Sequence, residues 1–553
     1  MTLFEVKAVN SLEKIFPSVH NDAAEQRYFT GARGEYAAFQ LAMRSSGNWT
    51  IDVEMESDIK ELITLHEVGL VPCTVPSNPA DDFVLTHDAG LFPDPLPLLK
   101  EGKRLRLSPG HWHAVWVKVA IPEDFPEAGI HKISFKFTIP KVDYFPWEPP
   151  EMEAEYAVEF EILNYALPKQ KLLNINWFHS DCLMTHFHTD AWSDRHWEIL
   201  EKYMRSLFEH GGNVLLTPLW PLPLDVAVGH KRPDCQLLTI TECRGKYDFD
   251  FTLLEKWLAL ARSIGFEYFE APHLFSQWGV KSAPRVIVNG ESRFGWECPA
   301  NSAEYRSYLE QLLPQLTAFF DKQGLHGKLF FHISDEPPLA YLENYRYAAS
   351  VVLPLVEDYP VIDALSDVDF YKTGAIKEPI PATPKFADFA QFDLKRRWVY
   401  YCGDYENGVP NRQFGLPSMR NRVFGILAYA EKIDGFLHWG FNFYFSQNSI
   451  NWYHDVWKDP TGGSGFSGGG PFNVYPGEDG PVDSIHHEIF REGLQDLRAC
   501  TLLEELAGKE AVMELLQKGL DTPLSLTSYP RSARWLLDVR HRLDNAILEK
   551  LQR

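Results

Sequence analysis

The spacing of apolar residues changes along this chain, and that change constrains its fold more than any other feature. Up to about residue 167, apolar and polar residues alternate with a period of two. The alternation is clearest in four sets of residues: Trp49, Ile51, Val53 and Met55; Val115, Val117 and Val119; Ile133, Phe135, Phe137 and Ile139; and Tyr156, Val158, Phe160 and Ile162. Half-buried strands between proline and glycine turns predict an N-terminal antiparallel β-sandwich over residues 1–167, with 140–150 as a long hairpin loop.

From residue 168 the pattern becomes one of short apolar runs that alternate with helical spacing. Helices are predicted at 192–210, at 252–264 (opened by a Thr252/Glu255 capping box and closed by Gly265) and at 303–323. Strands are predicted at 172–178, 213–219, 266–275, 328–333, 361–365, 386–392, 398–401 and 435–443. Roughly eight strands in about 280 residues predict a TIM (β/α)8-type barrel over 168–480, with an open doubly wound sheet as the alternative.

Two further segments complete the chain. Residues 459–480 are rich in glycine, and Gly463, Gly465 and Gly468 match GxGxxG. No predicted strand precedes this segment and no helix follows it, so we interpret 461–470 as an active-site flap or a surface loop rather than a phosphate-binding loop. Residues 481–553 are predicted to form a helical segment packed on the barrel, with an apolar stripe at Ile485, Ile489, Leu494 and Leu497.

Composition restricts the class of partner. The formal net charge of −23 disfavours nucleic acid and anionic membrane surfaces. Seven scattered cysteines without a CxxC pair indicate reduced thiols. The N-terminal residues lack a signal-peptide pattern, and no apolar run reaches the roughly 18 residues of a membrane span, so a cytoplasmic protein is expected. The aromatic content of 14% suits stacking against the apolar faces of a ligand.

The segment KLFFHISDEPP, residues 328–338, holds the main catalytic candidates. An apolar strand leads into Asp335 and Glu336, and two prolines then end it. In a barrel, this is the carboxyl end of a strand, where catalytic groups collect. Repulsion and burial should raise the pKa of one carboxyl group, which leaves a proton donor beside an anion. The alternative is that Asp335 caps the following helix and Glu336 is solvated in its first turn.

Other polar and aromatic residues fall at predicted strand ends on the same face. They are Trp177, His179, Trp220, His273, His332, Tyr401, Asp404, Trp439, Asn442 and Tyr444. Each one singly is more often a core or hydrogen-bonded residue than a functional one. Their convergence on one pocket would suit a sugar, because aromatic faces and hydrogen-bonding groups are found together there.

Metal and nucleophile motifs are weak in this sequence. His186-Phe187-His188 and His486-His487-Glu488 resemble ligand clusters, but neither has a third ligand at a spacing such as HExxH. We predict no nucleophile elbow, because the GxSxG match at 465–469 lies in the glycine-rich segment, which follows no predicted strand and leads into no predicted helix. We therefore expect neither a metal nor a cofactor.

Four stretches together resemble glycoside hydrolase family 123 and its relatives. They are residues 333–337 (ISDEP), 397–401 (RWVYY), 435–440 (GFLHWG) and 484–496, supported by Trp116 and the Gly129-Ile130 turn. The resemblance covers most of residues 110–500. His486-His487 departs from the family, where relatives commonly have Arg.

The resemblance implies a retaining exo-β-N-acetylgalactosaminidase-like mechanism that uses the 2-acetamido group of the substrate. Glu336 would be the general acid/base, and Asp335 would hold the acetamido N–H while its carbonyl oxygen attacks the anomeric carbon. Trp439 would stack on the sugar, with Tyr401 and Asn442 as hydrogen-bond partners.

Two alternatives stay open at this point. One is a glycosidase that acts on a sugar without an acetamido group and uses a protein nucleophile such as Asp404. The other is a carbohydrate-binding protein on an inactive barrel. The expected partner in every case is an oligosaccharide or glycoside, and the sequence sets neither the epimer and linkage nor the oligomeric state.

Overall fold

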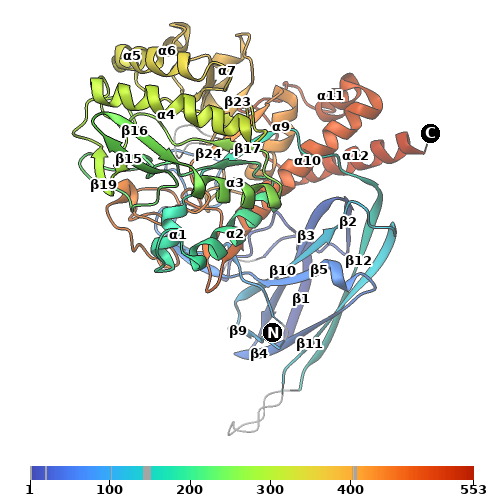
Figure 1. Cartoon of the computed structure of the whole chain (residues 1–553). Coiled ribbons are helices and arrows are strands. Elements are labelled where there is room, and N and C mark those ends of the chain that lie inside the picture. The colour runs from blue at the N-terminus through green and yellow to red at the C-terminus, as the bar shows by residue number, and fades with distance from the viewer. Residues whose placement is uncertain are drawn as a thin grey trace. The chain divides into compact units, whose positions relative to one another are not determined.

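The chain forms two compact units. The computed structural model describes residues 3–18, 21–100, 102–140, 151–401, 403 and 408–552 (Figure 1). Unit 1 comprises Met1–Gln170, Pro410–Glu431 and Val482–Arg553, and unit 2 comprises Lys171–Val409 and Lys432–Pro481. Most of the predicted 140–150 hairpin loop lies outside the described residues. Within the described ranges, no helix has the length and apolar character needed to cross a bilayer.

Unit 1 begins with two facing β-sheets, drawn in blue and cyan in Figure 1. Their orders are β1-β3-β10-β5 and β2-β12-β11-β4-β9. The strands of this region are β1 (Phe4–Asn10), β2 (Tyr28–Arg33), β3 (Glu35–Ser45), β4 (Trp49–Glu56), β5 (Ile63–Glu67), β6 (Leu70–Cys73), β7 (Gly90–Pro93), β8 (Pro95–Leu96), β9 (Leu105–Leu107), β10 (Trp112–Ile121), β11 (Gly129–Thr138) and β12 (Glu153–Ala166). Alternate residues of both sheets, such as Leu41, Val117, Phe135 and Phe160, fill one shared core.

One strand pair differs from the antiparallel prediction. β2 runs parallel to β12, with Phe29 opposite Phe160. The remaining pairs in the two sheets, such as β3 with β10 and β11 with β12, are antiparallel. Alternation indicates which face of a strand is buried but not the direction of the strand, so the sequence pattern did not distinguish parallel from antiparallel pairing.

The other part of unit 1 is helical. It contains α8 (Met419–Arg422), α9 (Phe424–Glu431), the short strand β26 (Pro481–Ser484) and the helices α10 (Ile485–Ala507), α11 (Lys509–Gln517) and α12 (Ala533–Leu551). Ser484 caps α10 by accepting a hydrogen bond from the His487 N–H. Ile485, Ile489 and Leu494 are buried, as the apolar stripe predicted. The tail was expected on the barrel, but these helices belong to the same compact unit as the two sheets.

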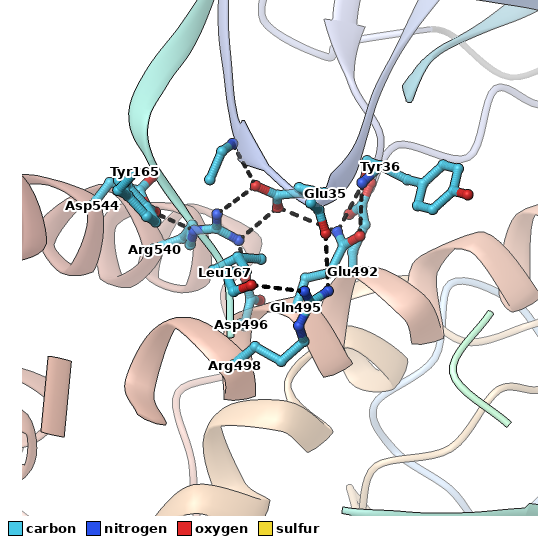
Figure 2. Close-up of polar contacts among 12 residues, drawn as sticks. Glu35, Tyr36, Tyr165, Leu167, Glu492, Gln495, Asp496, Arg498, Arg540 and Asp544 are labelled. Atoms are coloured by element: carbon cyan, nitrogen blue, oxygen red, sulfur yellow. Dashed lines mark hydrogen bonds and ion pairs between the residues drawn. The ribbon is translucent and has the colours of Figure 1, made fainter. Parts of the chain in front are cut away.

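Buried ion pairs link α12 and α10 to the sheets (Figure 2). Arg540 of α12 contacts Glu35 of β3 at 2.7 Å, Asp544 at 2.7 Å and Asp496 of α10 at 3.0 Å. All four side chains are less than a tenth exposed. Hydrophobic spacing carries no information about such pairs, which is why the sequence did not place the tail with the sheets.

Unit 2 is built on parallel strands. A six-stranded sheet has the order β20-β17-β14-β13-β24-β23, formed by β13 (Leu173–Asn176), β14 (Val214–Leu216), β17 (Tyr268–Glu270), β20 (Leu329–Phe330), β23 (Trp398–Tyr400) and β24 (Gly435–His438). A separate parallel pair consists of β21 (Ile362–Ala364) and β22 (Glu378–Ile380). Single parallel bridges, Phe331 with Val361 and Ala382 with Tyr400, join that pair to the two ends of the sheet. The arrangement is barrel-like, with two joins that are single bridges rather than ladders.

Helices and small hairpins occupy the connections of unit 2. The helices are α1 (Ser180–His186), α2 (Asp194–Glu209), α3 (Thr252–Ile264), α4 (Ala303–Lys322), α5 (Leu342–Val352), α6 (Val368–Lys372) and α7 (Phe386–Ala390). The remaining strands are β15 (Thr239–Cys243), β16 (Lys246–Asp250), β18 (Val286–Val288), β19 (Glu291–Phe294) and β25 (Tyr475–Pro476). The two hairpins, β15-β16 and β18-β19, were not predicted from the sequence.

The predicted strand at 386–392 was wrong. Residues 386–390 form helix α7, and the strand of this region is β22, at 378–380. Phe386 and Phe389 are both buried, and a spacing of three places them on one face of a helix. The strand prediction overlooked that spacing. It also overlooked Pro384, which lies in the helical turn just before α7.

The predicted capping box on α3 was also wrong. Phe251 is the N-cap residue, with no side-chain cap, and Thr252 is the first residue of the helix. The Thr252 hydroxyl donates instead to Asp250 at 2.6 Å. Gly265 does close the helix, at a φ of 129° that few other residues adopt.

Candidate active site

Asp335 and Glu336 follow β20 directly. The strand leads through Phe331, buried in the sheet, into the pair, and Pro337 then prevents the backbone from continuing it. Asp335 is 8% exposed, and Glu336 is half-buried. Glu336 has a φ of +43°, a left-handed conformation that costs a non-glycine residue energy and is concentrated at functional sites. The two carboxyl groups are therefore held at the end of the strand by a strained backbone.

The loop after β17 contacts Asp335. Gln277 donates from Nε2 to Asp335 Oδ2 at 3.1 Å, and the Trp278 N–H donates to the Asp335 carbonyl oxygen at 3.0 Å. Burial, and then the negative charge of Glu336, raise the pKa of Asp335 to about 8. The hydrogen bond from Gln277 opposes this rise, but it is the weaker effect. Asp335 therefore favours its protonated form at neutral pH.

Glu336 is held by the neighbouring strands. Tyr400, the last residue of β23, donates its hydroxyl to Glu336 Oε1, and the Glu336 N–H donates to the Ala364 carbonyl oxygen at 3.1 Å. Among the described residues, no lysine or arginine forms a salt bridge with either Asp335 or Glu336.

A buried histidine lies in the layer below this pair. His332 is fully buried, with Nε2 2.6 Å from Glu270 Oε1 and Nδ1 3.5 Å from Asp363 Oδ1. Burial alone would lower the pKa of His332, but Glu270 and then Asp363 outweigh it and raise the pKa to about 9. The imidazole is therefore a cation at neutral pH. It offsets two buried carboxylates and lowers the pKa of Asp335.

Asp363, on β21, fixes the backbone that carries the pair. Its Oδ1 accepts from the Ile333 N–H at 2.9 Å and the Ser334 N–H at 3.2 Å, and its Oδ2 accepts from the Tyr345 hydroxyl at 2.5 Å. Ser334 in turn donates from Oγ to the Ser276 carbonyl oxygen at 2.9 Å. Residues 333–334 are thus tied to β21 on one side and to the Ser276 loop on the other.

His273, His332 and Asp363 are close enough to be considered as metal ligands. One potential ligand atom from each lies within 4.8 Å of the others, and all three residues are buried. Asp363 already accepts three hydrogen bonds, and both ring nitrogens of His332 lie beside carboxylates, Nε2 at 2.6 Å from Glu270 and Nδ1 at 3.5 Å from Asp363. Burial, and then the neighbouring His332, hold the pKa of His273 well below its usual range. We therefore interpret this cluster as an ion-pair network and assign it no metal.

Four of the predicted sugar contacts lie in the core of unit 2. Trp177 is buried and donates from Nε1 to Glu270 Oε1 at 2.9 Å. Trp220 is also buried and donates from Nε1 to the His273 carbonyl oxygen at 3.3 Å. His273 packs on His332 with ring centroids 4.5 Å apart. Because their side chains are enclosed by protein, we assign Trp177, Trp220, His273 and His332 to the support of the site.

Another group of predicted contacts joins β13 to the segment after β24. Asn442 accepts from the His179 N–H at 2.8 Å and donates to the His179 carbonyl oxygen at 3.0 Å. His179 Nε2 lies 2.9 Å from the Trp439 carbonyl oxygen. Tyr444 donates its hydroxyl to the Val474 carbonyl oxygen at 2.8 Å. Asn442, His179 and Tyr444 are all buried, so they too serve the fold.

Trp439 is the predicted aromatic contact that keeps an exposed face. It is half-buried, and its ring lies 4.7 Å from that of Phe466 in the glycine-rich loop. That loop therefore lies beside a candidate platform. Tyr401 is buried against Phe436 at 4.8 Å, and Asp404 falls outside the described residues.

The two histidine pairs noted in the sequence are placed differently. His186 is partly exposed and packs on Tyr444, with ring centroids 5.9 Å apart. His486 lies in unit 1, where its Nδ1 is 2.8 Å from Asp94 Oδ1. Neither pair lies among the contacts of Asp335 and Glu336.

Sequence reasoning missed the residues that touch the pair most directly. Gln277 and Tyr400 contact Asp335 and Glu336, and Asp363 and Glu270 hold the histidine below. Asp363 and Glu270 carried a usable signal, because each is a carboxylate within an otherwise apolar buried strand, which demands a partner. Tyr400 precedes Tyr401, the predicted sugar contact, and because successive strand residues face opposite sides, it is Tyr400 whose hydroxyl reaches Glu336.

Comparison with known proteins places this site within a family. Residues 177–503 match the model of the glycoside hydrolase 123 catalytic domain, which is more than half of the chain. No curated protein matches significantly. A solved family 123 glycoside hydrolase from Clostridium perfringens, described for its glycolipid glycan hydrolysis, is 14% identical over 100% of this chain and 99% of that one, with a TM-score of 0.73.

A family 5 mannosidase from Rhizomucor miehei covers 62% of this chain and 96% of that one, at 10% identity and a TM-score of 0.35, too low to support a conclusion. The Clostridium perfringens structure shows the same fold along the full chain, and the family model spans Asp335 and Glu336. The chain belongs to glycoside hydrolase family 123.

Proposed function

We propose that the protein is a retaining exo-β-N-acetylgalactosaminidase-like enzyme that uses the 2-acetamido group of its substrate as the nucleophile. The observation that carries the proposal is a pair of adjacent carboxyl groups, buried Asp335 with a raised pKa and half-buried Glu336, without a neutralising lysine or arginine among the described residues. Such a pair supplies one proton donor and one anion at the same place.

The proposed first step transfers one proton to the leaving group. Glu336 protonates the glycosidic oxygen as the bond to the anomeric carbon breaks, while the acetamido carbonyl oxygen attacks that carbon and closes an oxazoline ring. Asp335 accepts a hydrogen bond from the acetamido N–H, which becomes more acidic as the ring forms. Water then opens the ring, with Glu336 taking its proton, and the configuration at the anomeric carbon is retained.

The contacts of the free enzyme explain how the proton reaches the right oxygen. Before substrate binds, burial keeps a proton on Asp335, and the Tyr400 hydroxyl positions Glu336 Oε1. An acetamido N–H that donates to Asp335 favours its anion and so releases that proton toward the adjacent Glu336. Substrate binding itself would thus prepare the acid. His332 supports the same shift, because its positive charge lowers the pKa of Asp335.

The barrel-like sheet of unit 2 is proposed to be a (β/α)8 barrel in which the β20–β21 and β22–β23 joins are loosened. The reason is functional: Phe331, Ala364 and Tyr400, at or beside these joins, lead to or contact the pair. Because these joins have few ladder hydrogen bonds, the Ala364 carbonyl oxygen is free to accept from the Glu336 N–H.

Paired aryl β-glycosides of galactose and N-acetylgalactosamine test this function. Cleavage of the acetamido sugar alone, with inhibition by a thiazoline mimic of the oxazoline, is the expected result. Cleavage of the plain galactoside would contradict the use of the acetamido group and require a protein nucleophile. Sugar binding by calorimetry without turnover of either glycoside would instead favour a binding protein.

A further inference from the structure

A cavity of about 710 Å³ lies in unit 2 beside the loops that follow β14 and β17. Its volume falls within the range of pockets that enclose a small ligand. Asp335 and Glu336 are not among its lining residues, but Ser276, which precedes the partner of Asp335, is. The cavity is therefore a neighbour of the catalytic pair rather than the pair's own pocket.

Serine hydrogen bonds connect the wall of this cavity to the catalytic segment. Ser334 donates to the Ser276 carbonyl oxygen at 2.9 Å, and Ser276 Oγ accepts from the Ser282 N–H at 3.1 Å. Ser282 Oγ then donates to the Trp296 carbonyl oxygen at 3.0 Å. This chain fixes Trp296 relative to the Asp335 backbone through two loops.

Trp296 offers a flat surface to this cavity. Its ring is half-exposed, and its Nε1 donates to the His230 carbonyl oxygen at 2.8 Å, which limits its rotation. Pro221, Pro284 and Pro299 also line the cavity, so its walls combine a fixed aromatic ring with rigid apolar groups. Aromatic rings held in this way stack on the C–H faces of sugars.

The charges around the cavity favour an uncharged ligand. Arg232 is paired with Asp181 at 2.7 Å, Arg285 is paired with Asp234, and Arg293 is paired with Glu304. The other two lining residues with a formal charge, Lys231 and Glu297, carry opposite charges. An anion such as a phosphate or a carboxylate would have to compete with these carboxylates for the guanidinium groups. A neutral sugar needs only stacking and hydroxyl contacts.

We infer that this cavity binds the neutral sugar on the leaving-group side of the scissile bond, with Trp296 as its stacking platform. The inference rests on the proposed function and adds a substrate class to it: the enzyme prefers an oligosaccharide whose second sugar occupies the cavity over a glycoside with a small leaving group. Trp296 determines that preference and takes no part in bond cleavage.

The test compares two substrates in the purified full-length protein and its Trp296→Ala variant. The substrates are an aryl β-N-acetylgalactosaminide and a neutral trisaccharide with the same terminal sugar. We expect Trp296→Ala to lower kcat/KM for the trisaccharide by about tenfold or more, because the stacking surface is lost. Turnover of the aryl glycoside and inhibition by the thiazoline should stay within about twofold, and Trp296→Phe should recover part of the loss.

Trp457→Ala is the matched control. Trp457 is also half-buried in unit 2 and donates from Nε1 to a backbone carbonyl, at 2.9 Å, but it does not line the cavity. The Trp457→Ala variant should leave kcat/KM for both substrates, and therefore the preference between them, unchanged. An equal loss for both substrates in Trp296→Ala would place the terminal sugar in the cavity and overturn the inference, as would no loss for either. If the wild-type protein cleaved neither substrate, the proposed function itself would be contradicted instead.

Discussion

The buried carboxylates around Arg540 in unit 1 and the candidate catalytic pair of unit 2 are neutralised differently. In unit 1, Arg540 pairs with Glu35, Asp496 and Asp544 (Figure 2). Arg422 also pairs with Asp496, and every one of these contacts is 3.0 Å or shorter. In unit 2, Asp335 and Glu336 lie together with a glutamine and a tyrosine as their side-chain partners. Buried charges with counterions hold elements in place, whereas buried charges without them keep a proton available for chemistry.

The two arrangements also differ in how they offset the free-energy cost of burying charge. The guanidinium of Arg540 bridges three carboxylates, so the charge that burial removes from water is balanced by charge. Asp335 is balanced by protonation instead, with its pKa raised to about 8. Together with the left-handed backbone at Glu336, this makes the catalytic pair a locally unfavourable arrangement that the surrounding fold sustains.

The largest expected effect is on catalysis. Glu336→Gln should lower kcat by at least the roughly 10²–10⁴-fold that general acid–base catalysis supplies, because the amide holds no transferable proton. Its melting temperature should match that of the wild type. Steady-state kinetics and a thermal melt check both.

Glu343→Gln, an exposed carboxylate on α5, is the control and should leave kcat unchanged. A Glu336→Gln variant with near-full activity would remove Glu336 from the mechanism.

The next effect concerns the paired network of unit 1. Arg540→Leu should lower the free energy of unfolding by about 3–5 kcal/mol, because it leaves Glu35, Asp496 and Asp544 buried beside one cation fewer. Urea unfolding measures the loss. Arg542→Leu, on the same helix but with its guanidinium on a backbone carbonyl, should change stability by less than about 1 kcal/mol. Equal losses in both variants would contradict the structural role assigned to this network.

The pH dependence of activity separates the two regions further. Since the pKa of Asp335 is raised to about 8, its proton is present below that pH and lost above it. We expect kcat/KM to fall about tenfold per pH unit above pH 8. A pH–rate profile that stays flat up to pH 10 would show that the pair carries no essential proton.

The smallest effect expected is that of Tyr400→Phe. Loss of the hydroxyl donated to Glu336 should lower kcat/KM about tenfold, a typical value for a hydrogen bond to a charged group. Tyr401→Phe, at the neighbouring residue predicted to contact the sugar, should lower kcat/KM less, because Tyr401 packs on Phe436 on the other side of the strand. A larger loss in Tyr401→Phe would contradict the assignment of Tyr400.

Much of the framework was predictable from periodicity. The alternation in strands such as β10 and β11 and the helical spacing in α2 are consequences of which face is buried, so a single chain reveals them. The prediction failed at residues 386–392, where a short apolar run fits either a strand or a helix. It also failed for β2, whose parallel direction depends on a partner far along the chain.

The candidate site was predictable only at its centre. The sequence alone determined that Asp335 and Glu336 end a buried strand, because charged residues after an apolar run and before two prolines have few other places to lie. Sequence spacing does not reveal which side chains lie inside, so Trp177, His332 and Asn442 looked like sugar contacts until their burial was known.

The tertiary structure alone decided the partners of the catalytic pair. Gln277, Tyr400 and Asp363 come from three other segments, and parallel strands brought them to one end of the sheet. The same holds for Arg540 and Glu35, which are paired although they lie at opposite ends of the chain. The physical reason is that burial periodicity is a local property, whereas the neutralisation of a charge depends on which distant segment supplies its partner.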